Sequence, residues 1–329
     1  MSNTESNKIP STIPYINKQT LQQTLTYADL IPALKLAFAS NIIAPKRHVY
    51  SLSEQPASTL LLMPVWQPQG TTGVKLVTVA PQNTLLPSVH AIFILFDTVS
   101  GVPLALIDGE ELTLRRTAAA SALASSYASR SDSEHLLMIG TGSLVPYLAC
   151  AHSQVRPIKQ ITVWGRSADK AAQTLKAIQA QTELAPHIRL SVATDLASAA
   201  SQADVISCAT TSTTPIVLGD WIKAGTHIDL VGGFTPGMRE VDDRLMSKAT
   251  VFVDTYEGAI AEAGDLTQTL SNGSLQRNAI VAELAELVSQ QHAGRHDDQQ
   301  ITVFKSVGTA IEDLCGANLA WQMHQRGVE

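Results

Sequence analysis

The strongest constraint on the fold is a regular alternation of short apolar runs and helical segments, which begins near residue 134. Apolar residues on both faces of a strand, with helical connections, are typical of a parallel sheet that helices cover on both sides. We therefore predict an α/β protein with a Rossmann-type, doubly wound parallel sheet. Its strands are expected at EHLLMIG (134–140), ITVW (161–164), IRLSVA (188–193), DVISCAT (204–210), HIDLVGG (227–233) and TVFVDT (250–255).

A different pattern precedes this alternation. Four β-branched, apolar segments between about residues 60 and 107 are separated by Gly, Pro and Asn, as antiparallel strands are. Between Leu30 and Ile43 apolar residues recur at helical spacing, which predicts a helix before the strands. An alanine-rich helix is expected from Thr113. The strand ITVFKSVG and the helix TAIEDLCGANLAWQMHQ end the chain.

The 329 residues suggest two domains. A terminal helix after a completed nucleotide domain often returns to the first domain, so we expect that domain to be discontinuous. The expected bounds are 1–118 with 309–329 for the first domain, and 119–308 for the nucleotide domain.

Composition excludes several classes of protein. The net charge of −6 does not favour nucleic acid as a partner. No apolar run approaches the ~18 residues that a membrane span needs, and the polar start MSNTESNKIPST is not a secretory signal. Cys150, Cys208 and Cys315 lie far apart, which fits reduced thiols in a cytoplasmic enzyme better than disulfides or a zinc site.

A glycine-rich turn indicates a dinucleotide site. Gly140-Thr141-Gly142 ends a predicted buried strand and precedes a helix, so its backbone can approach a pyrophosphate at the helix N-terminus. The third glycine position of this fingerprint is Val145, so the match is incomplete. Thr210 and Thr211 follow the fourth strand of the alternation, where they either contact a ligand or cap a turn.

The end of the second strand favours NADPH, with NADH as the alternative. NAD-preferring sites place an acid there, whereas this chain has Trp164-Gly165-Arg166-Ser167. A guanidinium can hold a 2′-phosphate through paired hydrogen bonds, although Arg166 can also be read as a solvated surface residue.

Three cations in the first domain indicate an anion site. Arg47 lies in APKRHVY, Lys75 in GVKLVTV and Arg116 in LRRTAAAS. Lys75 shares a strand face with two valines, which is unusual for an exposed lysine. Arg116 lies near a predicted helix N-terminus, where anions are favoured.

Eight motifs in order resemble the ornithine cyclodeaminase/mu-crystallin family. They are GVKLVTV, LPSVHAIFILFD, LRRTAAASALA, GTGS, VWGRS, PGMRE, EAGD and FKSVG. The resemblance implies a substrate-binding and dimerisation domain at 1–118 with 309–329, and an NADP-binding domain at 119–308. It also implies a homodimer in which Arg47, Lys75 and Arg116 hold a substrate carboxylate. It also implies cofactor contacts, for which we expect Ser88, Gly140, Thr141, Gly142, Ser143, Leu144, Gly165, Arg166, Ser167, Thr210, Thr211, Val231, Ser306, Val307 and Gly308. The family usually has Gln at the position of Leu144.

The family contains cyclic ketimine reductases, alanine dehydrogenases, ornithine cyclodeaminases and NADPH-binding mu-crystallins. Cyclodeaminases have an Asp shortly before a PGK-type turn, and the matching position here is Phe234. A phenyl ring accepts no proton, but it can cover a small apolar ring. The sequence VGGFTPGMREVD most resembles the reductases of Δ1-pyrroline-2-carboxylate and Δ1-piperideine-2-carboxylate.

The expected reaction is hydride transfer from the nicotinamide to C2 of a cyclic imine carboxylate, giving proline or pipecolate. The cations would fix C2 against the nicotinamide. Lys75 is the first candidate for the proton donor and His90 the second, although a single histidine on a strand is more often a packing or surface residue. The scattered histidines predict no metal site.

Overall fold

A computed structural model describes residues 12–327, and these form two compact units. The first contains the described residues up to Thr26, Ser40–Thr113 and those from Ala310 onward. The second contains Tyr27–Ala39 and Leu114–Thr309. Helix α2 (Tyr27–Phe38) belongs to the second unit because it contacts α4 (Val145–Val155) and α10 (Leu284–Val288), whereas the expected bounds put it in the first domain. The division after Thr113 falls inside the long helix α3 (Gly109–Ala128).

The first unit is built on a six-stranded sheet in the order β1-β6-β5-β4-β3-β2. Neighbouring strands are antiparallel, except that β1 and β6 are parallel. The strands are β1 (Tyr15–Ile16), β2 (His48–Glu54), β3 (Ala57–Trp66), β4 (Thr71–Val79), β5 (Val89–Asp97) and β6 (Pro103–Asp108). Helix α1 (Lys18–Thr24) and the last helix, α11 (Ala310–Arg326), complete this unit.

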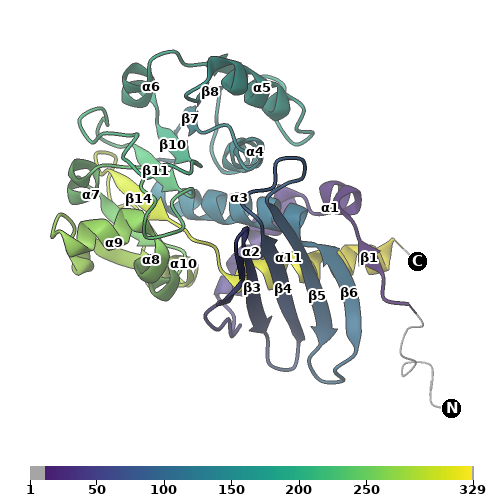
Figure 1. Ribbon diagram of the computed structural model, residues 1–329. Helices are drawn as coiled ribbons and strands as arrows, with labels where there is room; N and C mark the ends of the chain where they lie inside the picture. The colour runs from purple at the N-terminus through teal and green to yellow at the C-terminus, as the bar shows by residue number, and fades with distance from the viewer. Residues whose placement is uncertain (1–11, 328–329) are drawn as a thin grey trace. The chain divides into compact units, whose positions relative to one another are not determined.

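Helix α11 covers one face of this sheet, along β3, β4, β5 and β6 (Figure 1). Alternate residues of the strands face it and are buried, among them Met63, Val65, Phe93 and Leu95. Lys75 is on the same buried face and is 2% exposed. The four predicted antiparallel strands are therefore confirmed, with a charged residue inside the core of the unit.

The second unit has eight parallel strands in the order β13-β12-β14-β11-β10-β7-β8-β9, which confirms the predicted α/β class. The strands are β7 (His135–Ile139), β8 (Gln160–Trp164), β9 (Arg189–Val192), β10 (Val205–Cys208), β11 (His227–Leu230), β12 (Thr250–Val253), β13 (Ile280–Glu283) and β14 (Thr302–Lys305). Its remaining helices are α5 (Ala168–Gln179), α6 (Leu196–Gln202), α7 (Asp243–Lys248), α8 (Tyr256–Glu262) and α9 (Gly264–Ser271).

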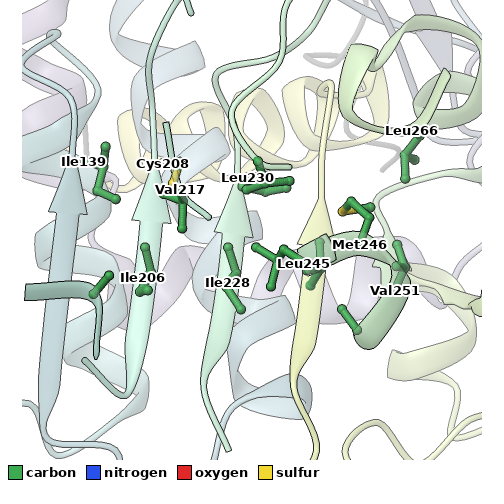
Figure 2. Packing of buried hydrophobic residues seen from close by; sticks show 14 of the residues in the cluster. Ile139, Ile206, Cys208, Val217, Ile228, Leu230, Leu245, Met246, Val251 and Leu266 are labelled. Carbon is green, nitrogen blue, oxygen red and sulfur yellow. The ribbon is translucent and has the colours of Figure 1, made fainter. Parts of the chain in front are cut away.

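Apolar side chains from neighbouring strands and the helices over them form the core of this sheet. Figure 2 shows Ile206 and Cys208 of β10 and Ile228 and Leu230 of β11 beside Leu245 of α7. The three cysteines are free and buried, and burial raises the pKa of Cys150 to about 12. Within residues 12–327, no helix has the length and apolar character that crossing a bilayer requires.

Three strands were not predicted: β1, β2 and β13. Every residue of β2 is exposed except Ser53, so the hydrophobic alternation that reveals a buried strand is absent there. Strand β2 is at the sheet edge, where backbone pairing with β3 is enough to order it. Strand β1 has two residues, which is too short for a clear pattern. Strand β13 is at the edge of its sheet and only alternate residues are buried, so it lacks the continuous apolar run of the predicted parallel strands.

Candidate functional site

The predicted cofactor residues of the second unit follow the carboxyl ends of five neighbouring strands. The strand order β14-β11-β10-β7-β8 places these ends side by side. From β7 the chain adds β8 and β9 on one side, and it then returns to add β10 on the other side of β7. Ligands of open α/β sheets bind at such a switch in strand order. The structure therefore brings together the residue groups 140–144, 165–167, 210–211, 231 and 306–308. Ser88 is in the first unit, in the β4–β5 connection.

The glycine turn after β7 has an open backbone beside the N-terminus of α4. Gly140 has a φ of +126°, and a Cβ there would lie 2.5 Å from the carbonyl oxygen of Ala209, so only glycine allows this approach. A Cβ on Gly142 would meet nothing within 4 Å, which leaves its backbone open. The N-cap residue of α4, Leu144, makes no side-chain hydrogen bond to the helix end. The amide groups there are thus suited to an anion.

The segment after β8 lies at the same carboxyl edge of the parallel sheet. Gly165 packs against Thr141, since a Cβ on it would lie 2.5 Å from the Thr141 Cγ2 atom. Ser167 is the N-cap of α5 and accepts a hydrogen bond from the Lys170 amide at 3.3 Å. Arg166, between them, is exposed, so its guanidinium can reach a ligand in solvent.

Arg116 lies directly against the loop that follows β14. It is 4% exposed, and a Cβ on Gly308 would lie 2.6 Å from its Nη1 atom. The Asp254 Oδ2 atom holds this loop by accepting hydrogen bonds from the Val307 and Gly308 amides, both at 2.8 Å. The second unit therefore places a buried guanidinium beside a predicted cofactor loop.

Lys75 is held inside the first unit by residues distant in sequence. Its Nζ atom donates to Asp313 Oδ1 of α11 at 2.8 Å and to Thr113 Oγ1 of α3 at 3.2 Å. Sequence reasoning missed Asp313. The available signal was an acidic pair, Glu312 and Asp313, in a terminal helix otherwise rich in small and apolar residues, where both prove to be buried.

The other predicted substrate residues occupy less enclosed positions. Arg47 is half-buried, just before β2. His90 is on the opposite face of the sheet from Lys75, since Lys75 pairs with Phe93, whereas His90 pairs with Thr78. Its Nδ1 atom lies 2.9 Å from Glu110 Oε1, and half of its side chain is exposed. Phe234 follows β11 and is 49% exposed.

Three buried charged residues at the same edge of the parallel sheet were not predicted as site residues. Glu240 is 1% exposed, and Asp265 and Lys305 are fully buried. Lys305 Nζ lies 3.3 Å from Asp265 Oδ2, and Asp265 Oδ1 accepts hydrogen bonds from the amides of Glu240 and Val241. Burial raises the pKa of Glu240, as does Asp265, while Lys305 and the donors of Thr210 lower it, with a net rise.

Comparison with known proteins decides the family. The sequence profile of the ornithine cyclodeaminase/mu-crystallin family matches residues 16–327. The chain belongs to this family.

Relatives that match most of this chain are named as Δ1-pyrroline-2-carboxylate reductases or as an alanine dehydrogenase. The Δ1-pyrroline-2-carboxylate reductase of Colwellia psychrerythraea is 38% identical over 309 residues, which are 92% of this chain and 96% of that one. The Thermococcus litoralis enzyme of the same name, solved with NADH and L-proline, superposes with a TM-score of 0.89 at 31% identity, covering 96% and 98% of the two chains. An archaeal alanine dehydrogenase dimer with bound NAD gives 0.87 at 26% identity, covering 96% and 97%.

Proposed function

We propose that this member of the family reduces cyclic imine carboxylates with NAD(P)H, converting Δ1-pyrroline-2-carboxylate to proline and Δ1-piperideine-2-carboxylate to pipecolate. The observation that carries this proposal is the contact of Arg116 with Gly308 at the carboxyl edge of the parallel sheet. A guanidinium there can hold a substrate carboxylate next to a bound dinucleotide. The names of the relatives at 38% and 31% identity support the same reaction.

The glycine turn fits the cofactor, because it combines an open backbone at Gly142 with a helix end that has no side-chain cap. The residues after β7, β8, β10, β11 and β14 would hold the dinucleotide, and the reduced nicotinamide would supply the hydride. We propose that Arg166 binds the 2′-phosphate and makes NADPH the preferred form. Ser88 is retained as a proposed contact contributed by the first unit.

Arg47, Lys75 and Arg116 form the proposed carboxylate clamp. Three cations that fix the carboxylate also fix the adjacent C2 atom, and positioning of this kind lowers a reaction barrier by several kcal/mol. As the hydride adds to C2, the C=N bond becomes a single bond and the ring nitrogen takes a proton. We propose that Lys75 supplies this proton, since the Lys75 side chain is buried and held by Asp313. His90 is on the opposite face of the sheet from Lys75. Phe234 would cover one face of the substrate ring.

We propose a homodimer that pairs through the first unit. The sheet face opposite α11 carries two apolar rows across the strands, and their side chains are only partly buried. One row contains Leu62, Leu76 and Ile92, and the next contains Pro64, Val74, Ile94 and Leu106. A continuous apolar face of this kind is typical of an interface.

The free, buried cysteines support our proposal of a cytoplasmic location.

An absorbance assay of NADPH oxidation tests the reaction. Oxidation with Δ1-pyrroline-2-carboxylate is the expected result, and the initial rate with NADH measures the cofactor preference. Oxidation only with pyruvate and ammonia would show an alanine dehydrogenase instead. Ammonia release from ornithine would show a cyclodeaminase, and NADPH binding without turnover of any imine would show a mu-crystallin-like binding protein.

Light scattering coupled to size-exclusion chromatography tests the dimer. The wild-type protein is expected at twice the 35.1 kDa chain mass, and Ile94→Asp is expected as a monomer. A monomeric wild-type protein would overturn the proposed assembly.

A further inference from the structure

The Glu240 carboxylate joins two loops of the second unit that follow neighbouring strands. Its Oε1 atom accepts hydrogen bonds from the Thr210 amide at 2.8 Å and the Thr210 hydroxyl at 2.9 Å. Its Oε2 atom accepts from the Gly232 amide at 2.9 Å and the Gly233 amide at 3.2 Å. All four donors are satisfied by a single side chain, and Thr210 and Gly232 lie after β10 and β11, respectively.

Glu240 is itself fixed from both sides. Its amide donates to Asp265 Oδ1 at 2.8 Å, and its carbonyl oxygen accepts from the amides of Ile216 and Val217. Asp265 in turn forms an ion pair with Lys305 at the end of β14. A carboxylate held in this way has little freedom to follow a movement of either loop, so it determines where both loops lie.

The two loops leave no room for a side chain at Gly232 or Gly233. A Cβ on Gly232 would lie 2.1 Å from the Thr210 carbonyl oxygen and 2.4 Å from Glu240 Oε1. A Cβ on Gly233 would lie 2.7 Å from Asp265 Oδ2. The backbone between Val231 and Phe234 therefore rests directly on the buried charged groups.

We infer that Glu240 is a positioning residue that couples the cofactor loop at Thr210 and Thr211 to the loop that carries Val231 and Phe234. This inference rests on the proposed function, which assigns those loops to the cofactor and the substrate ring. The proposal assigns Glu240 no direct contact with either ligand. It sets the distance between the two loops, so that both adopt the binding conformation before a ligand arrives, and the ordering cost on binding is reduced.

Glu240→Gln is the matching test, because the amide has the same size but only one oxygen. The variant keeps the acceptor for one loop and places an NH₂ group against the amide donors of the other. Hydrogen bonds to a charged group contribute about 1.5–3 kcal/mol each, so NADPH is expected to bind about 10- to 100-fold more weakly. The effect is expected in the Kd and KM for NADPH more than in kcat, because saturating cofactor restores the bound arrangement.

Asp242→Asn provides the control in the same segment. Asp242 Oδ1 accepts hydrogen bonds from the amides of Gly219 and Leu245, both at 2.9 Å. It therefore holds backbone outside the two loops that Glu240 joins. This variant is expected to lower stability while leaving the Kd for NADPH within about twofold of wild type. An equal loss of NADPH affinity in both variants would show that Glu240 acts only through general stability and would overturn the inference.

Hydrogen exchange separates this inference from the proposed function. In Glu240→Gln the loop that faces the new NH₂ group is expected to lose protection, at the Thr210 amide or at the Gly233 amide, and both amides are expected to keep it in Asp242→Asn, whether or not the protein reduces an imine. Unchanged protection in Glu240→Gln would overturn the positioning role. Failure of wild-type protein to oxidise NADPH with any imine would instead overturn the proposed reaction.

Discussion

Replacement of Gly308 by alanine tests the role of Arg116 when NADPH is saturating, because Gly308 is also a proposed cofactor contact. Gly308 has a φ of +79°, and alanine in the left-handed region costs about 1–2 kcal/mol. Its new Cβ would lie 2.6 Å from Arg116 Nη1, 3.1 Å from Nη2 and 3.3 Å from Cζ. Because ordinary contact begins at 3.4 Å, the guanidinium has to move by about 0.8 Å.

A shift of this size affects binding geometry more than stability, because the end of an arginine side chain can rotate away. Misplacement by about 1 Å in a positioning group lowers activity by about 10²-fold. We therefore expect kcat/KM for Δ1-pyrroline-2-carboxylate to fall by about 100-fold in Gly308→Ala, measured by NADPH oxidation.

Gly273→Ala is a matched control for backbone strain. Gly273 has a φ of +78°, and a Cβ there would meet nothing within 4 Å. Both variants are expected to lose about 1–2 kcal/mol in urea unfolding, and only Gly308→Ala is expected to lose activity. Equal kcat/KM values for the two variants would refute the assignment of Arg116 to the carboxylate clamp.

Three further predictions follow from single contacts. Arg166→Ala is expected to weaken NADPH by about 10- to 100-fold and NADH little, and an equal loss for both in a binding titration would remove the 2′-phosphate contact. Lys75→Met is expected to abolish imine reduction and to destabilise the fold by about 3–5 kcal/mol, and adding Asp313→Leu should recover stability in urea unfolding but not activity. Burial raises the pKa of Asp204, but hydrogen bonds from Lys223 and from the Glu134 and His135 amides lower it by more than burial raises it. The pKa of Asp204 is therefore below its ordinary value of 3.8. The stabilising effect of this carboxylate relative to Asp204→Asn should be complete at neutral pH and shrink as the pH falls below about 5, and a pH-independent difference between the unfolding free energies would contradict it.

Local sequence was informative wherever burial leaves a periodic pattern. Five of the six strands predicted from 134 to 255 are largely buried, and their apolar residues on both faces indicate them, whereas β9 is at the sheet edge and has no buried residue. The glycine turn after β7 is indicated by its position between a strand and a helix. The edge strand β2 was missed because exposure removes the pattern. Lys75 was correctly separated from ordinary surface lysines because it shares a strand face with valines, and it is 2% exposed.

The partners of the buried charges could not be predicted in this way. Lys75 pairs with Asp313, 238 positions along the chain, and Glu240 reaches Thr210 as well as Gly232. Such pairs depend on strand order and on which loops meet at a sheet edge, and no local pattern records either. The sequence by itself determined most strands of the two sheets, and it predicted the glycine turn and three cations of an anion site. Only the tertiary structure decided which buried carboxylates hold those groups in place, because an acid without its partner looks the same in sequence as an acid in solvent.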